Sequence, residues 1–595
     1  MISRTDPLGT VRYGYDRAGH QIRTVDVDGQ ETAVRVDATG RVVGVDVPGA
    51  SADARYAYTP AGLVTKMTDA TGTTRFSYDA RGLTTQVVHT PGTGAPGAGS
   101  VLKYGYDETG RLTSLTYPNG ATLTRGLDAA GRLTSITDPT AGRFNLTWGP
   151  DGNLATITYP NGVVTTADVD SRGLTTTLTI ADDAGAALLG MAYDYDAAGQ
   201  QTSITTTRPH IGDWPAPPGA TTNETSEFST SSQYTFDPLG RLDQVTGDGA
   251  GDVDFAVNGV LTALPGLTLT HNQLGQAQAA TRTTPTAATT WDFSYDPAGR
   301  QTTRTYQTTP ADPGQPTVSG QVTLTWDTAG HLMTWADTPA GAAEPAEEYA
   351  YTYTGDGLRR TTTHHTAGAD PATDTFVWSQ GLGGIPVLLT DGQHRFVYGA
   401  GMAPLAQITT TDTGGDTGRV AFLHTDTLGS VRAATNTQGE ELVRFDYDTH
   451  GYPTHTTGDT KATKFGYAGE YTDPTGLTYL RARYYDPGTG VFLTRDPLLD
   501  TTRNPYGYTG GNPLQHTDPT GLDWRDKAGQ ALVIGFRIRQ GAESRVTDTA
   551  LGIPDMAMSM TLMGQIKRDI DFTRILIEDG PRDAFNLHSN PLYGL

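Results

Sequence analysis

The chain has 595 residues, a formal net charge of −23 and no cysteine. The lack of cysteine excludes disulfides and thiolate metal sites, and the acidic balance argues against a nucleic-acid-binding surface on the main body of the chain. No run of about 18 apolar residues occurs, which excludes an ordinary transmembrane helix, and the first residues contain no apolar signal region. The 28 Tyr, 15 Phe and 7 Trp recur at regular positions, which indicates many short strands and argues against disorder.

An aromatic-Asp-x-x-Gly motif recurs through the first part of the chain. Clear copies begin at Tyr15, Tyr78, Tyr106, Tyr195, Phe236 and Tyr295, and the early glycines stand at positions 19, 40, 62, 82, 110, 131, 152 and 173. A period of about 21 residues indicates a repeat architecture. Each unit is predicted to form two strands joined by a tight turn at Asp-x-x-Gly. Because the motif is present from the first residues, we expect the chain to begin inside the array.

The repeats predict a mainly β fold. One hairpin cannot bury its apolar face alone, whereas stacked hairpins can form a continuous sheet. Twist and the need to protect edges would curl or close so long a sheet. We therefore predict a large spiral or cocoon-like shell of β-hairpins. A short, mainly helical C-terminal extension should follow it, with helices over 528–540 and 555–579.

An acidic loop at 247–254, with the sequence GDGAGDVD, offers oxygen ligands of the kind that Ca²⁺ prefers. It lacks the spaced carboxylates and the terminal bidentate Glu of an EF-hand loop. A solvated acidic turn is the preferred interpretation, and we expect neither a metal nor a cofactor.

The stretch 495–522 marks a sharp change of composition and contains two Asp-Pro steps. Asp496 and Asp518 stand 22 residues apart, on either side of a run rich in Gly, Asn, Pro and Tyr. Two carboxyls within roughly 3 Å share a proton, so that one can activate water while the other protonates a leaving nitrogen. The alternative is that each Asp-Pro step is only a turn, and the spacing does not decide between the two.

Several motifs resemble the Rhs (rearrangement hotspot) or YD-repeat family, which is related to the C subunits of insecticidal toxin complexes. They are 423–432 (LHTDTLGSVR), 465–471 (FGYAGEY), 476–487 (GLTYLRARYYDP) and 490–497 (GVFLTRDP), in the order of the family's repeat-associated core. The resemblance implies a hollow β-cocoon that encloses a toxin. It divides the chain into a repeat array at 1–419, a repeat-associated core at 420–522 and a variable region at 523–595 that is the candidate toxin cargo.

The resemblance also implies self-cleavage after the leucine of Asp-Pro-x-Gly-Leu, here the bond Leu522–Asp523. It assigns Asp496 and Asp518 as the aspartic pair, and Arg495 is a possible charge partner of Asp496. The family has Gly where this chain has Leu499. If that glycine supplied a positive φ or a close backbone approach, Leu499 would strain the loop and misplace Asp496 enough to slow the reaction.

Other polar residues of the core are given structural roles. His424 and Asp426 lack a nucleophile at a recognisable spacing, and Arg481 and Arg483 are expected to pair with internal carboxylates. No catalytic set other than the aspartic pair is found, so the only enzymatic activity expected is a single cut of the chain itself. Nothing in 523–595 identifies an activity.

The leading hypothesis is an encapsulating shell of a polymorphic toxin that releases its own C-terminal peptide by autoproteolysis. The resemblance implies a secreted or cell-surface protein of interbacterial competition. It also implies an immunity protein, a secretion-system component or cell-surface carbohydrate as partners beside the cargo. The alternative is a cell-surface YD-repeat protein that binds carbohydrate or a protein partner without cleavage.

Overall fold

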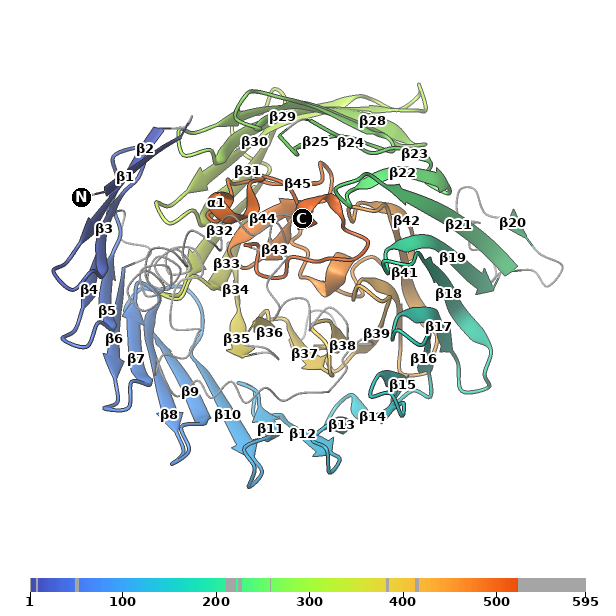
Figure 1. Cartoon of the computed structure of the whole chain (residues 1–595), viewed down its shortest axis with the longest axis horizontal. Coiled ribbons are helices and arrows are strands. Elements are labelled where there is room, and N and C mark those ends of the chain that lie inside the picture. The colour runs from blue at the N-terminus through green and yellow to red at the C-terminus, as the bar shows by residue number, and fades with distance from the viewer. Residues whose placement is uncertain are drawn as a thin grey trace.

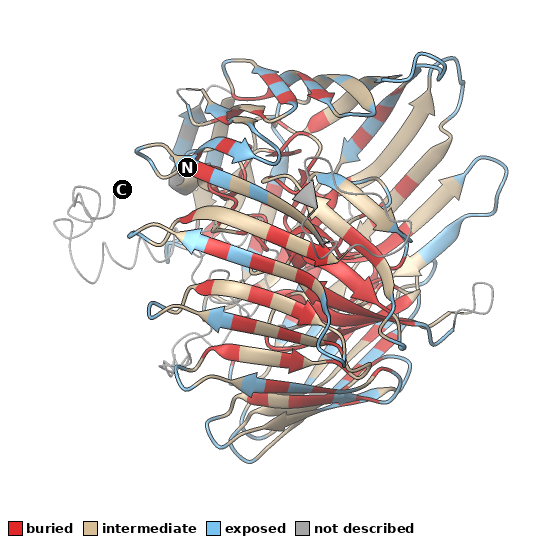
Figure 2. Ribbon diagram, turned by 90° about the vertical axis from the view of Figure 1, so that its right-hand side faces the viewer, coloured by how far each residue is buried: buried red, intermediate tan, exposed pale blue. Residues whose placement is uncertain are grey.

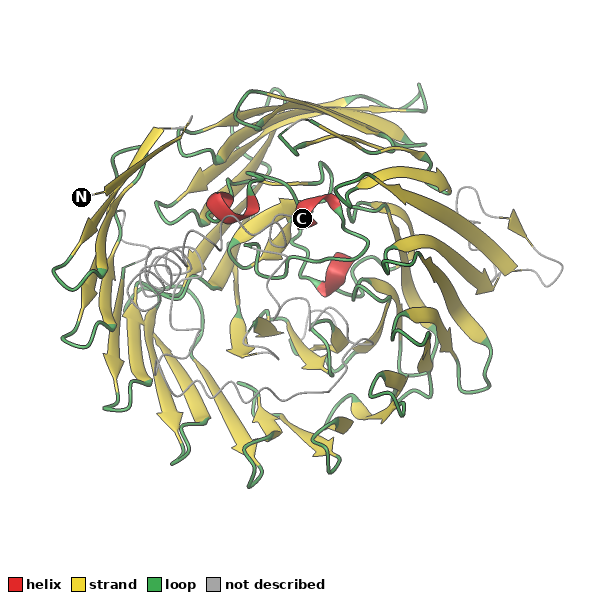
Figure 3. Ribbon diagram, in the orientation of Figure 1, coloured by secondary structure: helices red, strands yellow, loops and turns green. Residues whose placement is uncertain are grey.

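The computed structural model describes residues 2–6, 9–48, 53–209, 221–222, 227–256, 258–380, 385–411 and 417–522. In this part of the chain nearly every element is an antiparallel strand, and four sheets of 23, 11, 8 and 3 strands follow one another. They run from β1 (Ile2–Asp6) to β23 (Gly251–Asp252), from β24 (Asp254–Phe255) to β34 (Ala372–Thr375), from β35 (Val377–Gln380) to β42 (Pro453–Gly458), and from β43 (Thr478–Leu480) to β45 (Val491–Phe492). Figure 3 shows strands around the whole circumference and only short helical turns near the centre.

The strands form a spiral, which confirms the predicted fold class. Strands adjacent in sequence pair in order, apart from the short β20 (Thr221–Thr222), which folds back on its neighbour β21 (Glu227–Phe236). Figure 1 shows the first sheet as an outer wall, and β35–β39 lying inside it. The last strands and the single-turn helix α1 (Leu499–Thr502) lie near the centre. The sheet has therefore wound back inside itself.

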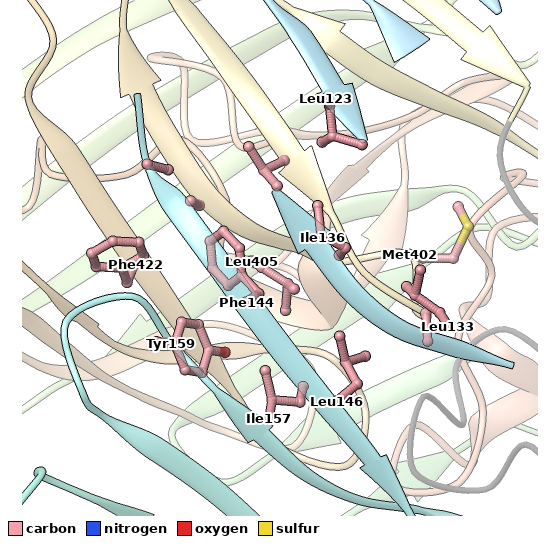
Figure 4. Close-up of a cluster of buried hydrophobic side chains, with 14 of the residues drawn as sticks. Leu123, Leu133, Ile136, Phe144, Leu146, Ile157, Tyr159, Met402, Leu405 and Phe422 are labelled. Carbon is pink, nitrogen blue, oxygen red and sulfur yellow. The ribbon is translucent and has the colours of Figure 1, made fainter. Parts of the chain in front are cut away.

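Packing between the outer and inner windings forms the largest core. Phe144 on β14 (Gly142–Trp148) meets Phe422 on β39 (Val420–Thr425) edge to face at 5.7 Å between ring centroids, and Figure 4 shows them among Leu, Ile and Met side chains of both windings. The Tyr159 hydroxyl donates to the Leu423 carbonyl at 2.8 Å. Such aromatic pairs add to the burial of apolar area, so this core fixes the inner winding against the outer one.

The Asp of each repeat closes its turn, as Asp107 illustrates. Its Oδ1 accepts the N–H groups of Thr109 and Arg111, both at 2.9 Å, and its Oδ2 accepts Arg111 Nε at 2.7 Å. The N–H of Arg111 and the hydroxyl of Thr109 lower the pKa of Asp107. Gly110 takes the left-handed conformation that the turn needs, with φ +88°.

The aromatic residue of several motifs joins its repeat to the one before. Hydroxyls of Tyr78, Tyr106 and Tyr195 donate to the carbonyls of Val64, Thr84 and Thr175 in the preceding repeats, at 2.7 to 2.8 Å. Where a Trp replaces Tyr, its indole N–H makes the same contact, from Trp148 to Leu133 O at 2.8 Å. The Tyr-Asp pair is thus a unit in which Asp shapes the turn and Tyr sets the spacing of repeats.

Burial alternates along the strands, as period-two side chains require. In β14, Phe144 and Leu146 are buried, whereas Arg143, Asn145 and Thr147 between and beside them are exposed. Figure 2 shows this alternation along many strands of the shell.

The remaining expectations have mixed outcomes. The loop at 247–254 contains a turn between β22 (Leu242–Gly247) and β23, and among the described residues no cluster of three or more His, Cys, Asp or Glu could hold a metal ion. None of the helices in the described ranges has the length and apolar character that crossing a membrane requires. The helices predicted at 528–540 and 555–579 lie outside the described residues.

Candidate functional site

The segment 495–522 lies at the centre of the spiral, held against the turns of the outer winding. Four side chains along it donate to carbonyls of turn glycines in different repeats: Asn504 to Gly259 at 3.1 Å, Tyr506 to Gly299 at 2.8 Å, Asn512 to Gly240 at 3.0 Å and Gln515 to Gly199 at 2.5 Å. Because these carbonyls belong to repeats far apart in the sequence, the segment takes its shape from the assembled shell.

Each aspartate of the predicted pair closes its own turn, so the turn interpretation holds for both. Asp496 Oδ1 accepts the N–H of Leu498 at 2.7 Å, and Asp518 Oδ1 accepts the N–H of Leu522 at 3.0 Å. Both side chains are nonetheless buried, with 5% of Asp496 and 2% of Asp518 exposed. A turn on the surface would not require this burial, since Asp is almost never fully buried unless it is paired.

Arg483 brings the two carboxylates together. Its Nη2 lies 3.7 Å from Asp496 Oδ2 and 3.4 Å from Asp518 Oδ2. The guanidinium, on β44 (Arg483–Asp486), is itself 3% exposed and stacks on the Phe492 ring at 3.6 Å. Both aspartates therefore face one cation in a site shielded from water, where charge interactions are strong.

The two aspartates differ in the groups around them. Burial, together with the nearby charge of Asp496, raises the pKa of Asp518 to about 6 against the opposing effect of Arg483. The Leu522 N–H and the Thr520 hydroxyl also lower it. Asp496 receives donors on both oxygens, from Leu498 N–H and, at 2.7 Å, from the Thr502 hydroxyl. Asp518 can hold a proton in mildly acidic solution while Asp496 serves as an acceptor.

The three residues before Leu522 each accept a hydrogen bond at their backbone carbonyl; these three hydrogen bonds are called the carbonyl grip. Arg481 Nη1 donates to Pro519 O at 2.6 Å, Ala482 N–H donates to Thr520 O at 3.1 Å, and Arg483 Nε donates to Gly521 O. The two residues of the turn between β43 and β44 and the first residue of β44 thus hold three consecutive residues of the segment that ends at Leu522.

Gly521 is required by this grip. Its φ is +67°, and a Cβ there would lie 2.6 Å from Leu480 O and 3.0 Å from Arg483 N. Only glycine fits so close to backbone atoms in this conformation. The Gly-Leu pair at the end of the motif is therefore explained by its fit against the β43–β44 turn.

The sequence predicted Arg495 as a charge partner of Asp496. In the structure, the guanidinium that faces both aspartates is that of Arg483. Arg495 is half-buried, and its charge acts on Tyr506, opposing the rise in that residue's pKa that burial causes. Arg483 was expected to pair with a carboxylate, which the structure confirms. Its place between the two aspartates does not follow from the sequence.

Leu499 does not strain the loop through a positive φ. It is the first residue of α1, and its N–H donates to Asp496 O at 3.2 Å. The left-handed conformation falls instead on Arg503, with φ +56°, at the C-terminal end of α1. The concern that Leu499 replaces a glycine needed for its φ is thus not supported by the backbone.

Two further residues of the core are structural, as predicted. The His424 ring is fully buried with Nε2 2.9 Å from the Thr435 hydroxyl, and burial lowers its pKa to about 3. Asp426 closes its turn by accepting Leu428 and Ser430 N–H groups and lies 3.6 Å from Arg432.

Glu470 is a site residue that sequence analysis did not identify. It is 4% exposed, its Oε2 accepts Arg481 Nη1 at 2.5 Å, and burial raises its pKa to about 7 against the effect of Arg481. The charge of Asp518 contributes to this rise, which places Glu470 within electrostatic reach of the aspartic pair. In the sequence, Glu470 could have been noticed as the one acidic residue in the otherwise uncharged run Tyr467–Tyr471.

Comparison with known proteins supports this reading of the fold. The Teneurin YD-shell family model matches residues 6–212. A solved structure titled TcdB2-TccC3-TEV superposes over 86% of this chain and 27% of its own, with a TM-score of 0.62 at 19% identity. Residues 6–212 thus match the YD-shell family in sequence, and the described chain has the fold of a YD-repeat shell.

Three relatives of this YD-repeat shell are toxins or nucleases by name. The tRNA3(Ser)-specific nuclease WapA of Bacillus spizizenii is 28% identical over 50% of this chain and 11% of its own length. The double-stranded DNA deaminase toxin A of Burkholderia cenocepacia is 31% identical over 25% of this chain and 12% of its own. Toxin protein Tse5 of Pseudomonas aeruginosa is 37% identical over 18% and 8%. The chain spans about a tenth of the length of these relatives.

Proposed function

We propose that this shell encapsulates its own C-terminal region as toxin cargo and cuts the chain once, between Leu522 and Asp523. The observation that carries the proposal is the pair of buried carboxylates, Asp496 and Asp518, facing one guanidinium beside a segment gripped up to Leu522. In this proposal residues 1–419 form the array, 420–522 form the core with the cutting site, and 523–595 are released.

The proposed reaction is an aspartic-type hydrolysis. Asp496 accepts a proton from water, and the resulting hydroxide adds to the carbonyl carbon of Leu522. Asp518, protonated at first, gives its proton to the nitrogen of Asp523, and the C–N bond breaks. Leu522 gains a carboxylate and Asp523 gains an amine. Arg483 holds Gly521 O and both aspartates, which fixes the reacting segment relative to the two carboxyls.

The relatives support the toxin assignment. WapA, the deaminase toxin and Tse5 are named for toxic or nuclease activities, and each shares with this chain a region about a tenth of its length. A conserved shell joined to varied activities would explain this pattern. We extend it to propose a secreted or cell-surface toxin with an immunity protein as partner. The activity of 523–595 is left unassigned.

Mass analysis of the purified protein tests the proposal. The parent should yield a fragment that begins at Asp523, while Asp496→Asn and Asp518→Asn should each leave one chain of 63.1 kDa. Asp107→Asn is the matched control, because Asp107 also closes a turn and pairs with an arginine but belongs to the repeat array. If both site variants still cut at Leu522, the pair is not catalytic. If the parent stays intact under all conditions, the proposal fails and the carbohydrate- or protein-binding alternative is favoured.

A further inference from the structure

We propose that Arg481 and Glu470 are a positioning pair for the cut and make it depend on the inner winding of the shell. The inference rests on the proposed self-cleavage and adds two residues that do not touch the reacting bond. It also adds a condition, because the pair is complete only when β36 (Pro386–Thr390) is in place.

Arg481 connects three parts of the chain through one guanidinium. Its Nε donates to Pro386 O at 2.9 Å, and its Nη1 donates both to Glu470 Oε2 at 2.5 Å and to Pro519 O at 2.6 Å. The side chain is 5% exposed. Pro386 belongs to the third sheet, Glu470 to the loop before β43, and Pro519 to the segment that ends at the cut. Arg481 is therefore a rigid link between the inner winding and the cleavage segment.

Arg481 is the first of the two loop residues that join β43 to β44, where Leu480 pairs with Arg483. Its φ is +60°, a left-handed conformation that such two-residue hairpin loops use. The tight loop fixes the backbone of Arg481, and the contacts with Pro386, Glu470 and Pro519 hold its guanidinium.

Only arginine suits these contacts. Its planar fork presents fixed donors in several directions, whereas the ammonium of lysine is a single compact group. Glu470 supplies a charged acceptor that orients the fork, and an amide oxygen in the same place could accept the same hydrogen bond. The role of Glu470 in this inference is to orient Arg481 and involves no proton transfer.

The link ties cutting to assembly. Pro519 follows Asp518 directly, so displacement of the Pro519 carbonyl also moves the Asp518 carboxyl and the Leu522 N–H bound to it. Because β36 is part of the sheet that packs inside the outer winding, Arg481 can hold Pro519 only after that sheet has formed. The shell would thus be closed around its content before the chain is cut.

The rate of cutting of newly made full-length chain tests the inference. Chain is pulse-labelled in a cell-free reaction, and its conversion to the Asp523 fragment is followed over time. Arg481→Lys and Glu470→Ala should each slow the cut at least tenfold, since a displacement of about 1 Å can cost roughly a hundredfold. Glu470→Gln should cut faster than Glu470→Ala, because the amide oxygen still accepts from Arg481, although the charge partner of that guanidinium is lost.

The pair Glu441 and Arg444 provides the matched control. These residues form an equally buried Glu–Arg contact, with side chains 6% and 7% exposed, on β41 (Glu441–Tyr447), away from the cut. Arg444→Lys and Glu441→Ala should cut at the parent rate. Because Arg481→Lys could fail to fold, protease resistance of the shell is compared in the same samples, and the double variant Glu470→Ala/Arg481→Lys is measured. For a positioning pair the double variant should be no slower than the slower single variant.

The outcomes separate this inference from the proposed function. Cutting by Asp518→Asn at the parent rate would overturn the aspartic mechanism itself, whatever Arg481 does. If Asp518→Asn is inactive and Arg481→Lys cuts at the parent rate, the positioning role is wrong while the aspartic pair stands. If Glu470→Gln is as slow as Glu470→Ala, the acceptor oxygen at this position does not orient Arg481, and the assignment of Glu470 as a positioning residue is overturned.

Discussion

Removing the Thr520 hydroxyl should make the chain cut faster at alkaline pH. That hydroxyl donates to Asp518 Oδ1 at 3.2 Å and lowers the pKa of the carboxyl, against the effect of burial that raises it to about 6. Thr520→Val removes the donor and keeps the shape, so the pKa should rise further. The protonated form of Asp518 is the proposed acid, and a higher pKa keeps it protonated to higher pH.

The size of the shift follows from the strength of the lost hydrogen bond. A hydrogen bond to a charged group contributes about 1.5–3 kcal/mol, and at 3.2 Å the lower end applies. One pKa unit corresponds to about 1.4 kcal/mol, so the descending limb of the pH–rate profile should move up by about one unit. The variant should then cut up to about tenfold faster than the parent near pH 8. Near pH 5 the rates should match, because Asp518 is mostly protonated in both.

The assay is the conversion of pulse-labelled chain after dilution into buffers from about pH 5 to about pH 8, over which the acid form of Asp518 titrates. Thr517→Val is the control, because the buried Thr517 hydroxyl has no hydrogen-bond partner among the described residues and should not move the limb. A variant that is slower by the same factor at every pH, or a limb that does not move, would refute the assignment of Asp518 as the acid.

Three other substitutions test the site and the shell. Leu499→Gly should leave the rate of cutting within about threefold, because Leu499 has a helical backbone, while weakening α1 by roughly 1 kcal/mol in hydrogen exchange; a large acceleration would show that Leu499 does impede the site. Gly521→Ala should slow the cut about a hundredfold, since its Cβ would clash with backbone atoms, and a parent-like time course would contradict the grip described here. Asp138→Asn should lower the urea midpoint of the shell by the equivalent of about 3–5 kcal/mol, because it leaves Arg395 buried without its charge partner. The double variant Asp138→Asn/Arg395→Met should recover much of that loss. Equal urea midpoints for the single and the double variant would contradict the idea that unpaired Arg395 causes the loss.

The repeats could be predicted from sequence because their structure is local. Each turn is closed within about five residues by Asp and Gly, so the Asp-x-x-Gly spacing reports the geometry directly. The inner winding could not be placed in the same way. The contact between Arg395 and Asp138 joins residues 257 positions apart, and neither residue belongs to a sequence pattern from which its partner could be predicted. What selects that pairing is the packing of whole sheets, which is a property of the assembled spiral.

The same limit explains which parts of the candidate site were predicted. Asp496 and Asp518 stand in recognisable Asp-Pro motifs, and their turns are local. Arg483 and Glu470 act through contacts across the core, and in sequence they look like ordinary polar residues of a buried strand and loop. Arg495 was chosen because it adjoins Asp496, whereas Arg483 reaches both aspartates from β44, 13 residues before Asp496 in the sequence. Adjacency in sequence does not reveal a cation that approaches from another strand.

The arrangement of contacts also indicates how the proposed cut would leave the shell intact. The carbonyl grip by Arg481, Ala482 and Arg483, the N–H contact of Leu522 with Asp518 and the donors along 504–515 are all made by residues up to 522. Hydrolysis after Leu522 breaks none of these contacts. The new carboxylate would form next to the segment that Arg483 already holds, while the residues beyond 522 would lose their only covalent link to the shell. Because the described contacts of the site all lie on the shell side of the bond, the proposed cut would leave these contacts in place.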